Sequence, residues 1–99
     1  MAGLAHPRLA PLLTALHRDP GEAWPLPRMA AVAGLSRSNL AETFARVVGI
    51  TPAAYLNGWR IDLACQELRV GRPVGVVADR LGFSGAAAFS RAFRERMGC

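Results

Sequence analysis

The amino-acid sequence predicts an all-α fold in which two similar helical units are joined by one long helix. The composition supports helices, because Ala and Leu dominate, only 7% of the 99 residues are aromatic and the valines do not alternate along the chain. Apolar residues recur at spacings of three and four, which places them on one face of a helix. A pattern of small residues also occurs twice. The length suits one domain, so we expect residues 1–99 to form a single domain.

The first unit is expected over residues 7–50 and begins with a helix from about Pro7 to His17. A second, short helix follows the two prolines of the next segment, with Leu26 as its N-cap and Pro27 at its first position. Ser36 is suited to cap a third helix, and Gly49 to end it. The apolar residues of the three helices are Leu9, Leu12, Leu13 and Leu16, then Met29, Ala30 and Ala33, then Leu40, Phe44 and Val47.

The connecting helix is expected over residues 51–70. Thr51-Pro52 provides an N-cap and a first helical residue, and Gly71 and Pro73 are stop signals. Its predicted apolar stripe is Tyr55, Leu56, Trp59, Leu63 and Leu68. The second unit, expected over 71–99, has a short apolar helix with Val77, Ala78 and Leu81, then a cap at Ser84, then a last helix with Phe89, Phe93 and Met97 inside.

An internal repeat is the main evidence for what these units are. Ala30-x-x-x-Gly34-x-Ser36 matches Ala78-x-x-x-Gly82-x-Ser84 at an offset of 48, and after the cap the offset is 49, where Phe44 matches Phe93 and Gly49 matches Gly98. A small residue lets two helices cross closely, and a glycine permits the tight turn between them. Each unit therefore fits a helix-turn-helix, whose second helix enters the major groove of DNA.

The charge agrees with a nucleic-acid partner. The net charge is +5, and all twelve basic side chains are arginines, whose guanidinium group suits bidentate contacts to phosphate and guanine. No apolar run is long enough to span a membrane and no signal peptide is present, so we expect a cytoplasmic protein. Neither the cysteines, Cys65 and Cys99, nor the histidines, His6 and His17, form a ligand pattern, so no metal or cofactor is expected.

Several motifs resemble the DNA-binding domain of AraC/XylS-type transcriptional regulators, and the likeness runs from about His6 to Cys99. The motifs are Leu35-Ser36-Arg37-Ser38-Asn39-Leu40 with Phe44, Gly49-Ile50-Thr51-Pro52-x-x-Tyr55-Leu56, Trp59-Arg60, Val77-Ala78-x-x-Leu81-Gly82-Phe83-Ser84, and Phe89-Ser90-Arg91-Ala92-Phe93-Arg94.

The resemblance implies homeodomain-like subdomains with six to seven helices in all, in a bacterial regulator that is most often an activator. It also implies contact with RNA polymerase as well as DNA, and an N-terminal effector or dimerisation domain, which we expect to be absent from this chain. Members continue past the final glycine with Ser-Pro and a short helix, so we expect the second subdomain to be truncated at its C-terminus. Arg60 matches a position that we interpret as structural.

The predicted DNA contacts come from the outer faces of the two second helices. By the resemblance, the base-reading positions of the first unit fall on Ser38, Ala41 and Glu42. Glu42 is suited to accept from a cytosine amino group, or alternatively to pair with Arg46, and Ala41 to meet a thymine methyl. Arg46 is expected to bind phosphate. The full set of expected contacts is Arg37, Ser38, Ala41, Glu42, Arg46, Ser84, Gly85, Ala86, Ala87, Ser90, Arg91 and Arg94.

The two units are expected to contribute differently. Gly85-Ala86-Ala87-Ala88 has no side chain for direct readout, so the second unit should give close backbone approach and phosphate contacts, with Arg91 its strongest candidate. The first unit should carry most of the sequence discrimination. A connecting helix of eighteen residues would be about 27 Å long, close to the roughly 34–36 Å of one DNA turn. Both helices are therefore expected to enter successive major grooves.

Other functions fit the sequence less well. The featureless Gly85–Ala88 stretch leaves open a degenerate helix-turn-helix that binds another protein instead of DNA. No catalytic triad, phosphate loop or carboxylate pair is present, so an enzyme is not expected. RNA binding would need an aromatic stacking surface, and the aromatic residues here lie at core spacing.

Overall fold

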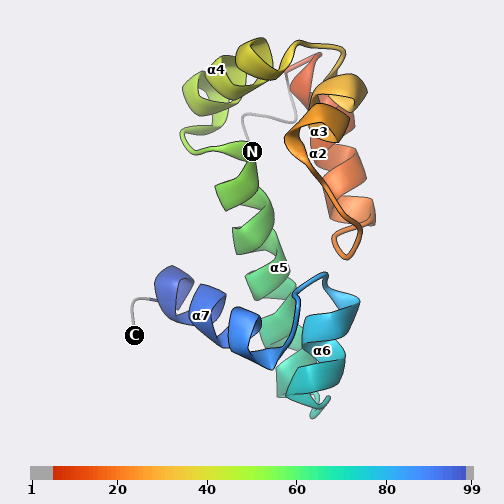
Figure 1. Cartoon of the computed structure of the whole chain (residues 1–99), viewed down its shortest axis with the longest axis vertical. Helices are drawn as coiled ribbons and strands as arrows, with labels where there is room; N and C mark the ends of the chain where they lie inside the picture. Colours follow the sequence, from red (N-terminus) through yellow and green to blue (C-terminus); the bar gives the residue numbers. More distant parts are fainter. Residues whose placement is uncertain (1–5, 98–99) are drawn as a thin grey trace. The chain divides into compact units, whose positions relative to one another are not determined.

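The computed structural model describes residues 6–97, which form six α-helices and, within that range, no strand (Figure 1). The all-α prediction is confirmed. The chain divides into two compact units: unit 1 holds residues 6–19 and Trp24–Leu56, and unit 2 holds Pro20–Ala23 and residues 57–97. The helices are α2 (Leu9–Arg18), α3 (Leu26–Ala33), α4 (Arg37–Val48), α5 (Pro52–Arg69), α6 (Val74–Arg80) and α7 (Ala86–Met97).

Unit 1 is built around the apolar faces predicted for its three helices. The four leucines of α2 are completely buried, and so are Leu40 and Phe44 of α4. Phe44 also makes an edge-on contact with the ring of Tyr55, 5.7 Å between centroids, which ties the start of α5 to this core. Helix α3 buries Met29, Ala30 and Ala33, and it ends at Gly34, whose left-handed conformation stops the helix.

The caps predicted at Ser36 and Thr51 are confirmed, and the cap predicted at Leu26 is wrong by one residue. The Ser36 hydroxyl accepts from the Asn39 amide at 3.1 Å, and the Thr51 hydroxyl accepts from the Ala54 amide at the same distance. However, α3 begins at Leu26, with Pro25 in an extended conformation as its N-cap. Pro27 is thus the second helical residue, where its missing N–H is still no loss because the first helical amides have no partner within the helix.

The stripe predicted for α5 is only partly right, because this one helix serves two cores. Leu56 is buried in the core of unit 1, whereas Ile61 and Ala64 are completely buried in the core of unit 2. Leu56 and Ile61 lie five residues apart, a spacing that no single three-and-four stripe contains. Ile61 was therefore missed, and the predicted residues Trp59 and Leu63 are only half-buried.

Unit 2 departs from the prediction at both ends of its last helix. Helix α7 begins at Ala86, so Gly85, not Ser84, stands before the first helical residue, and the Gly85 carbonyl accepts from the Phe89 amide. The extra residue of the second repeat accounts for this shift. Phe89 is buried as expected, but Met97 is 50% exposed, because no element within residues 6–97 packs over it. Gly98, the match of Gly49, lies outside the described residues.

The two turns that the repeat predicted have the same geometry. The Leu35 amide donates to the Ala30 carbonyl at 3.0 Å, and the Phe83 amide donates to the Ala78 carbonyl at 2.9 Å. Gly34 and Gly82 are both left-handed, with φ of 69° and 86°. Ala30 and Ala78 are both buried. The offset of 48 in the sequence is thus an offset between two copies of one hydrogen-bonded helix-turn-helix.

Replacing Gly82 with Ala is expected to destabilise the fold more than the same change at Gly71. Both residues have nearly the same φ, 86° and 88°, so both variants pay the left-handed cost of about 1–2 kcal/mol. A Cβ at Gly82 would also lie 3.0 Å from the Gly21 carbonyl oxygen, whereas one at Gly71 would have no neighbour within 4 Å. Urea unfolding of the two variants measures the difference. Equal losses would contradict the tight contact at Gly82.

Candidate nucleic-acid interface

The residues predicted to read DNA in unit 1 lie on one outward stripe of α4. Ser38, Ala41 and Glu42 are all exposed, and Ala45 continues the stripe one turn later. The stripe is opposite Leu40 and Phe44, which are completely buried. Because the apolar face of α4 is buried in the core, the opposite face, which carries the stripe, is exposed to solvent. The two arginines of α4, Arg37 and Arg46, are exposed near its ends.

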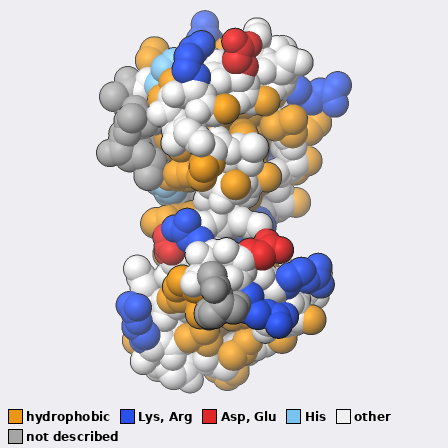
Figure 2. Space-filling view, turned by 90° about the vertical axis from the view of Figure 1, so that its left-hand side faces the viewer, with side chains coloured by type: hydrophobic (Ala, Val, Ile, Leu, Met, Phe, Trp, Pro, Cys, Tyr) orange, Lys and Arg blue, Asp and Glu red, His pale blue; other side chains and the backbone are white. Residues whose placement is uncertain are grey.

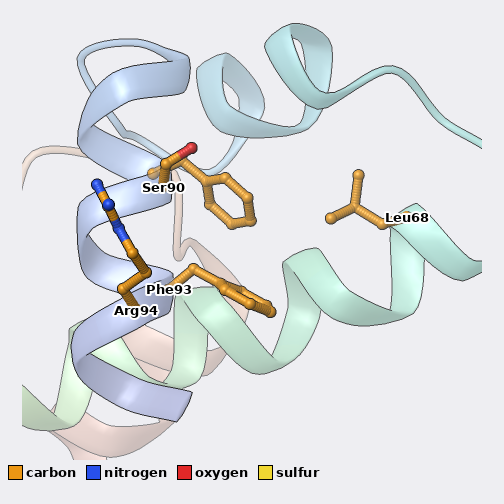
Figure 3. A pocket seen from close by; sticks show the side chains of 5 residues that line it. Leu68, Ser90, Phe93 and Arg94 are labelled. Atoms are coloured by element: carbon orange, nitrogen blue, oxygen red, sulfur yellow. The ribbon is translucent and has the colours of Figure 1, made fainter. Parts of the chain in front are cut away.

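Helix α7 presents an equivalent stripe at the offset of 49. Ala87, Ser90, Arg91 and Arg94 occupy the positions of Ser38, Ala41, Glu42 and Ala45, and all four are exposed. Figure 3 shows Phe93 on the side of α7 that faces Leu68 of α5, while Arg94 extends away from that pair. Ser84 and Ala86 are exposed at the start of the helix, and Gly85 is half-buried.

The two stripes occupy equivalent positions of the repeat, but they differ in charge. Glu42 of α4 corresponds to Arg91 of α7, and Ala45 corresponds to Arg94. The alternative pairing of Glu42 with Arg46 is not formed, since the ion pairs of the described residues involve neither side chain. Helix α4 therefore offers a carboxylate acceptor between two arginines, and α7 offers guanidinium donors with no acidic group among the stripe positions.

Other arginines are engaged within their own units. Arg72 donates to the Glu67 carboxylate at 2.8 Å, Arg80 pairs with the same carboxylate, and Arg96 pairs with Asp62 at 3.2 Å. In unit 1, the Arg28 guanidinium lies 4.0 Å from the centre of the Trp24 ring. Figure 2 shows arginine side chains beside exposed apolar ones on the face of unit 2 in its lower half. None of these ion pairs includes Arg91 or Arg94.

Sequence reasoning left these arginines out of the predicted DNA contacts, but it did not predict their partners. Glu67 and Arg80 are thirteen positions apart, and no spacing rule links residues so far apart in different helices. Only Arg60 was expected to be structural, and that expectation came from the resemblance. In the structure Arg60 donates to two backbone carbonyls and is half-buried.

Glu67 links three parts of unit 2, namely α5, the segment after it and the end of α6. Its side chain is only 12% exposed, and the hydrogen bond from Arg80, together with the charges of Arg80 and Arg72, holds the pKa of its carboxyl below the ordinary value. A carboxyl whose pKa is lowered by folding stabilises the folded state above its unfolded pKa, and this stabilisation is lost as the pH falls through the lowered pKa.

Glu67→Gln is therefore expected to lower the free energy of unfolding at pH 7 by about 1 kcal/mol, a modest value because both arginines are more than half exposed. The gap between the variant and the parent should narrow as the pH falls below about 4.5. Urea unfolding at a series of pH values measures both. Glu95→Gln, an exposed glutamate of α7, is the control. A gap that stays constant down to low pH would contradict the assignment.

Comparison with known proteins decides the family. A helix-turn-helix domain model matches residues 29–99, which is well over half of the chain. The chain belongs to the AraC-type helix-turn-helix DNA-binding domains. It is 42% identical over 99 residues to an AraC-like transcription regulator of Streptomyces antibioticus, and 36% identical over 97 residues to the transcriptional activator RclR of Escherichia coli. These two matches include 99% and 97% of this chain. The chain spans only about a third of the length of each relative, 33% and 34%.

Solved structures support the same AraC-type assignment. The DNA-binding domain of AdpA, solved in complex with a target DNA, matches with a TM-score of 0.86 at 26% identity, over 95% of this chain and 85% of that one. An AraC-type regulator from Chromobacterium violaceum matches with a TM-score of 0.85 at 23% identity, over 94% and 84%, and shows the fold. Within residues 6–97, every helix is too short or too polar to cross a bilayer.

Proposed function

We propose that this chain, residues 1–99, is a sequence-specific double-stranded-DNA-binding domain that uses α4 and α7 as its two recognition helices. The observation that carries the proposal is the repeated turn, with matching hydrogen bonds and a left-handed glycine, followed each time by a helix with an exposed polar stripe. A helix-turn-helix places the exposed side of its second helix in the major groove. The solved complex of AdpA with DNA supports the same use of this fold.

The chemistry of the two stripes favours a division of roles. Glu42 accepts hydrogen bonds and suits the amino group of cytosine, and the Ala41 methyl suits a thymine methyl. Arg91 and Arg94 are donors of long reach, which suits phosphates and guanine. We therefore assign most base discrimination to α4, with Ser38 beside Glu42, and most of the backbone attraction to α7. At the start of α7, Ser84, Gly85 and Ala86 allow the DNA backbone to approach closely.

The connecting helix supports binding on two successive major grooves. Helix α5 is continuous over eighteen residues, Pro52–Arg69, and contributes Leu56 to the core of unit 1 and Ile61 and Ala64 to the core of unit 2. We propose subdomains over residues 7–50 and 71–99 with residues 51–70 between them. One chain would then make the two groove contacts for which most helix-turn-helix proteins need a dimer.

The role of the whole protein is a proposal of wider scope. The name of the relative RclR supports the proposal of a bacterial transcription activator. Contact with RNA polymerase and a cytoplasmic location are further parts of the proposal, and they come from the family resemblance alone. Its effector or dimerisation domain would lie N-terminal to this chain. We propose that the domain acts by binding alone, in keeping with its family of DNA-binding domains.

A gel-shift titration over a series of salt concentrations tests DNA binding. The DNA is a site selected from a random pool by this protein. Binding should weaken as a power of the salt concentration, because each phosphate contact releases counterions. Failure to select any sequence, or affinity independent of salt, would favour the protein-interaction alternative and overturn the proposal.

Arg91→Ala is expected to weaken binding roughly tenfold and to lower the salt slope by about one if the side chain neutralises a phosphate. The reason is that Arg91 is exposed on the α7 stripe and takes part in no ion pair of the described residues. Arg72→Ala is the control, because that arginine pairs with Glu67. Equal effects of the two changes would show that total charge matters and position does not.

Glu42→Ala is expected to change the preferred base at one position of the site. Loss of a carboxylate that accepts from cytosine should reduce the preference for that base by about tenfold, within the usual 1–3 kcal/mol of one base contact. Competition binding with single-base variants measures this, and Glu95→Ala serves as the control. If all variants of the site change affinity by the same factor, Glu42 does not read a base.

A further inference from the structure

The structure extends the internal repeat to the first helix of each unit, at a different offset. Arg8-Leu9-x-x-Leu12 matches Arg60-Ile61-x-x-Ala64 at an offset of 52, and the four apolar residues are all completely buried in their own cores. The arginine guanidinium reaches the turn glycine in both units. A Cβ at Gly34 would lie 3.2 Å from Arg8, and a Cβ at Gly82 would lie 2.9 Å from Arg60.

The two offsets differ by four residues, so the first unit has four more residues from Leu12 to Ala30 than the second has from Ala64 to Ala78. Four residues from this connection, Pro20–Ala23, belong to unit 2 and not to unit 1. We call Pro20–Ala23 the inserted segment. A stretch that is extra in one copy of the repeat therefore packs within the other copy.

The inserted segment lies against the turn of the second helix-turn-helix. Arg60 donates from Nε to the Pro20 carbonyl at 2.6 Å and from Nη2 to the Glu22 carbonyl at 2.8 Å. Between these two residues, the Gly21 carbonyl oxygen faces Gly82, and a Cβ at Gly21 would overlap the carbonyl oxygen of Arg80. The backbone of the inserted segment, the guanidinium and the turn are thus in direct contact.

This arrangement depends on a guanidinium group. Burial lowers the pKa of Arg60, and the two carbonyl acceptors replace the water that the cation loses. Its planar fork binds two acceptors in fixed directions while its face stays free for the turn. A lysine keeps the charge, but its single ammonium cannot span both carbonyls in this plane.

We propose that Arg60 and the inserted segment form a brace that fixes the turn at residues 81–85 and thereby sets the orientation of α7. Arg60 is then a positioning residue for DNA recognition by α7, with no contact to DNA of its own. The inference rests on the proposed DNA binding only for its functional consequence. Its structural part, the ordering of the turn, stands on the contacts above.

Arg60→Lys tests the brace in binding. Because α7 is assigned mainly phosphate contacts, its share of binding is measured by the salt dependence of the affinity. In Arg60→Lys the salt slope should fall by about one, as in Arg91→Ala, although the charge of the chain is unchanged. The preference for the base that Glu42 reads should stay within about twofold of the parent. Arg69→Lys, an exposed arginine of the same helix, is the control and should keep both the salt slope and the base preference.

Hydrogen exchange tests the brace without DNA. Arg60→Lys and Gly21→Ala should each speed exchange of the Gly82 and Phe83 amides, which close the second turn. The Leu35 amide, which closes the first turn, is the internal reference. Both measurements are made well below the melting temperature of each variant. Unchanged exchange at the turn, or a salt slope equal to that of the parent, would overturn the brace. If the parent protein selects no DNA sequence, but the turn amides exchange faster in the two variants, only the proposed function is overturned and the brace stands.

Discussion

The left-handed glycine turn is the constraint on which the rest of the structure depends. At Gly34 and at Gly82 the chain reverses direction within three residues, and the following amide returns to the carbonyl of a buried alanine. A larger side chain at either alanine would push the two helices apart, and a Cβ at either glycine would strain the turn. Because the turn fixes the direction in which the next helix leaves, it also decides which side of α4 or α7 faces outward.

Much of the fold was predictable because local rules act within a few residues. The caps at Ser36 and Thr51 follow from one hydroxyl and the amide three residues later, and the leucines of α2 follow from helical period alone. The failures have a different origin. Ile61 was missed because α5 is buried against two cores, and Met97 was misjudged because periodicity indicates a helix face but not whether another element covers it.

The candidate site was predictable in position and less so in electrostatics. The outward stripes of α4 and α7 are what remains once Phe44 and Phe89 are buried, so their members follow from the same periodicity. Which arginines are free to meet DNA does not follow, because the partners are distant in sequence. Arg60 binds carbonyls about forty residues away, and Arg80 binds a glutamate in another helix.

This distribution changes what the net charge of +5 means. Within the described residues, five arginines have a partner in their own unit, in four cases at the surface: Arg28, Arg60, Arg72, Arg80 and Arg96. The charge left on the stripes is uneven, since α7 carries Arg91 and Arg94 whereas α4 carries Glu42. Phosphate attraction is sequence-independent, and a carboxylate near DNA is tolerated only where a base donor meets it. Under the proposed division of roles, affinity would come mainly from α7 and base discrimination mainly from α4. Substitutions on one helix could then change one property while the other is kept.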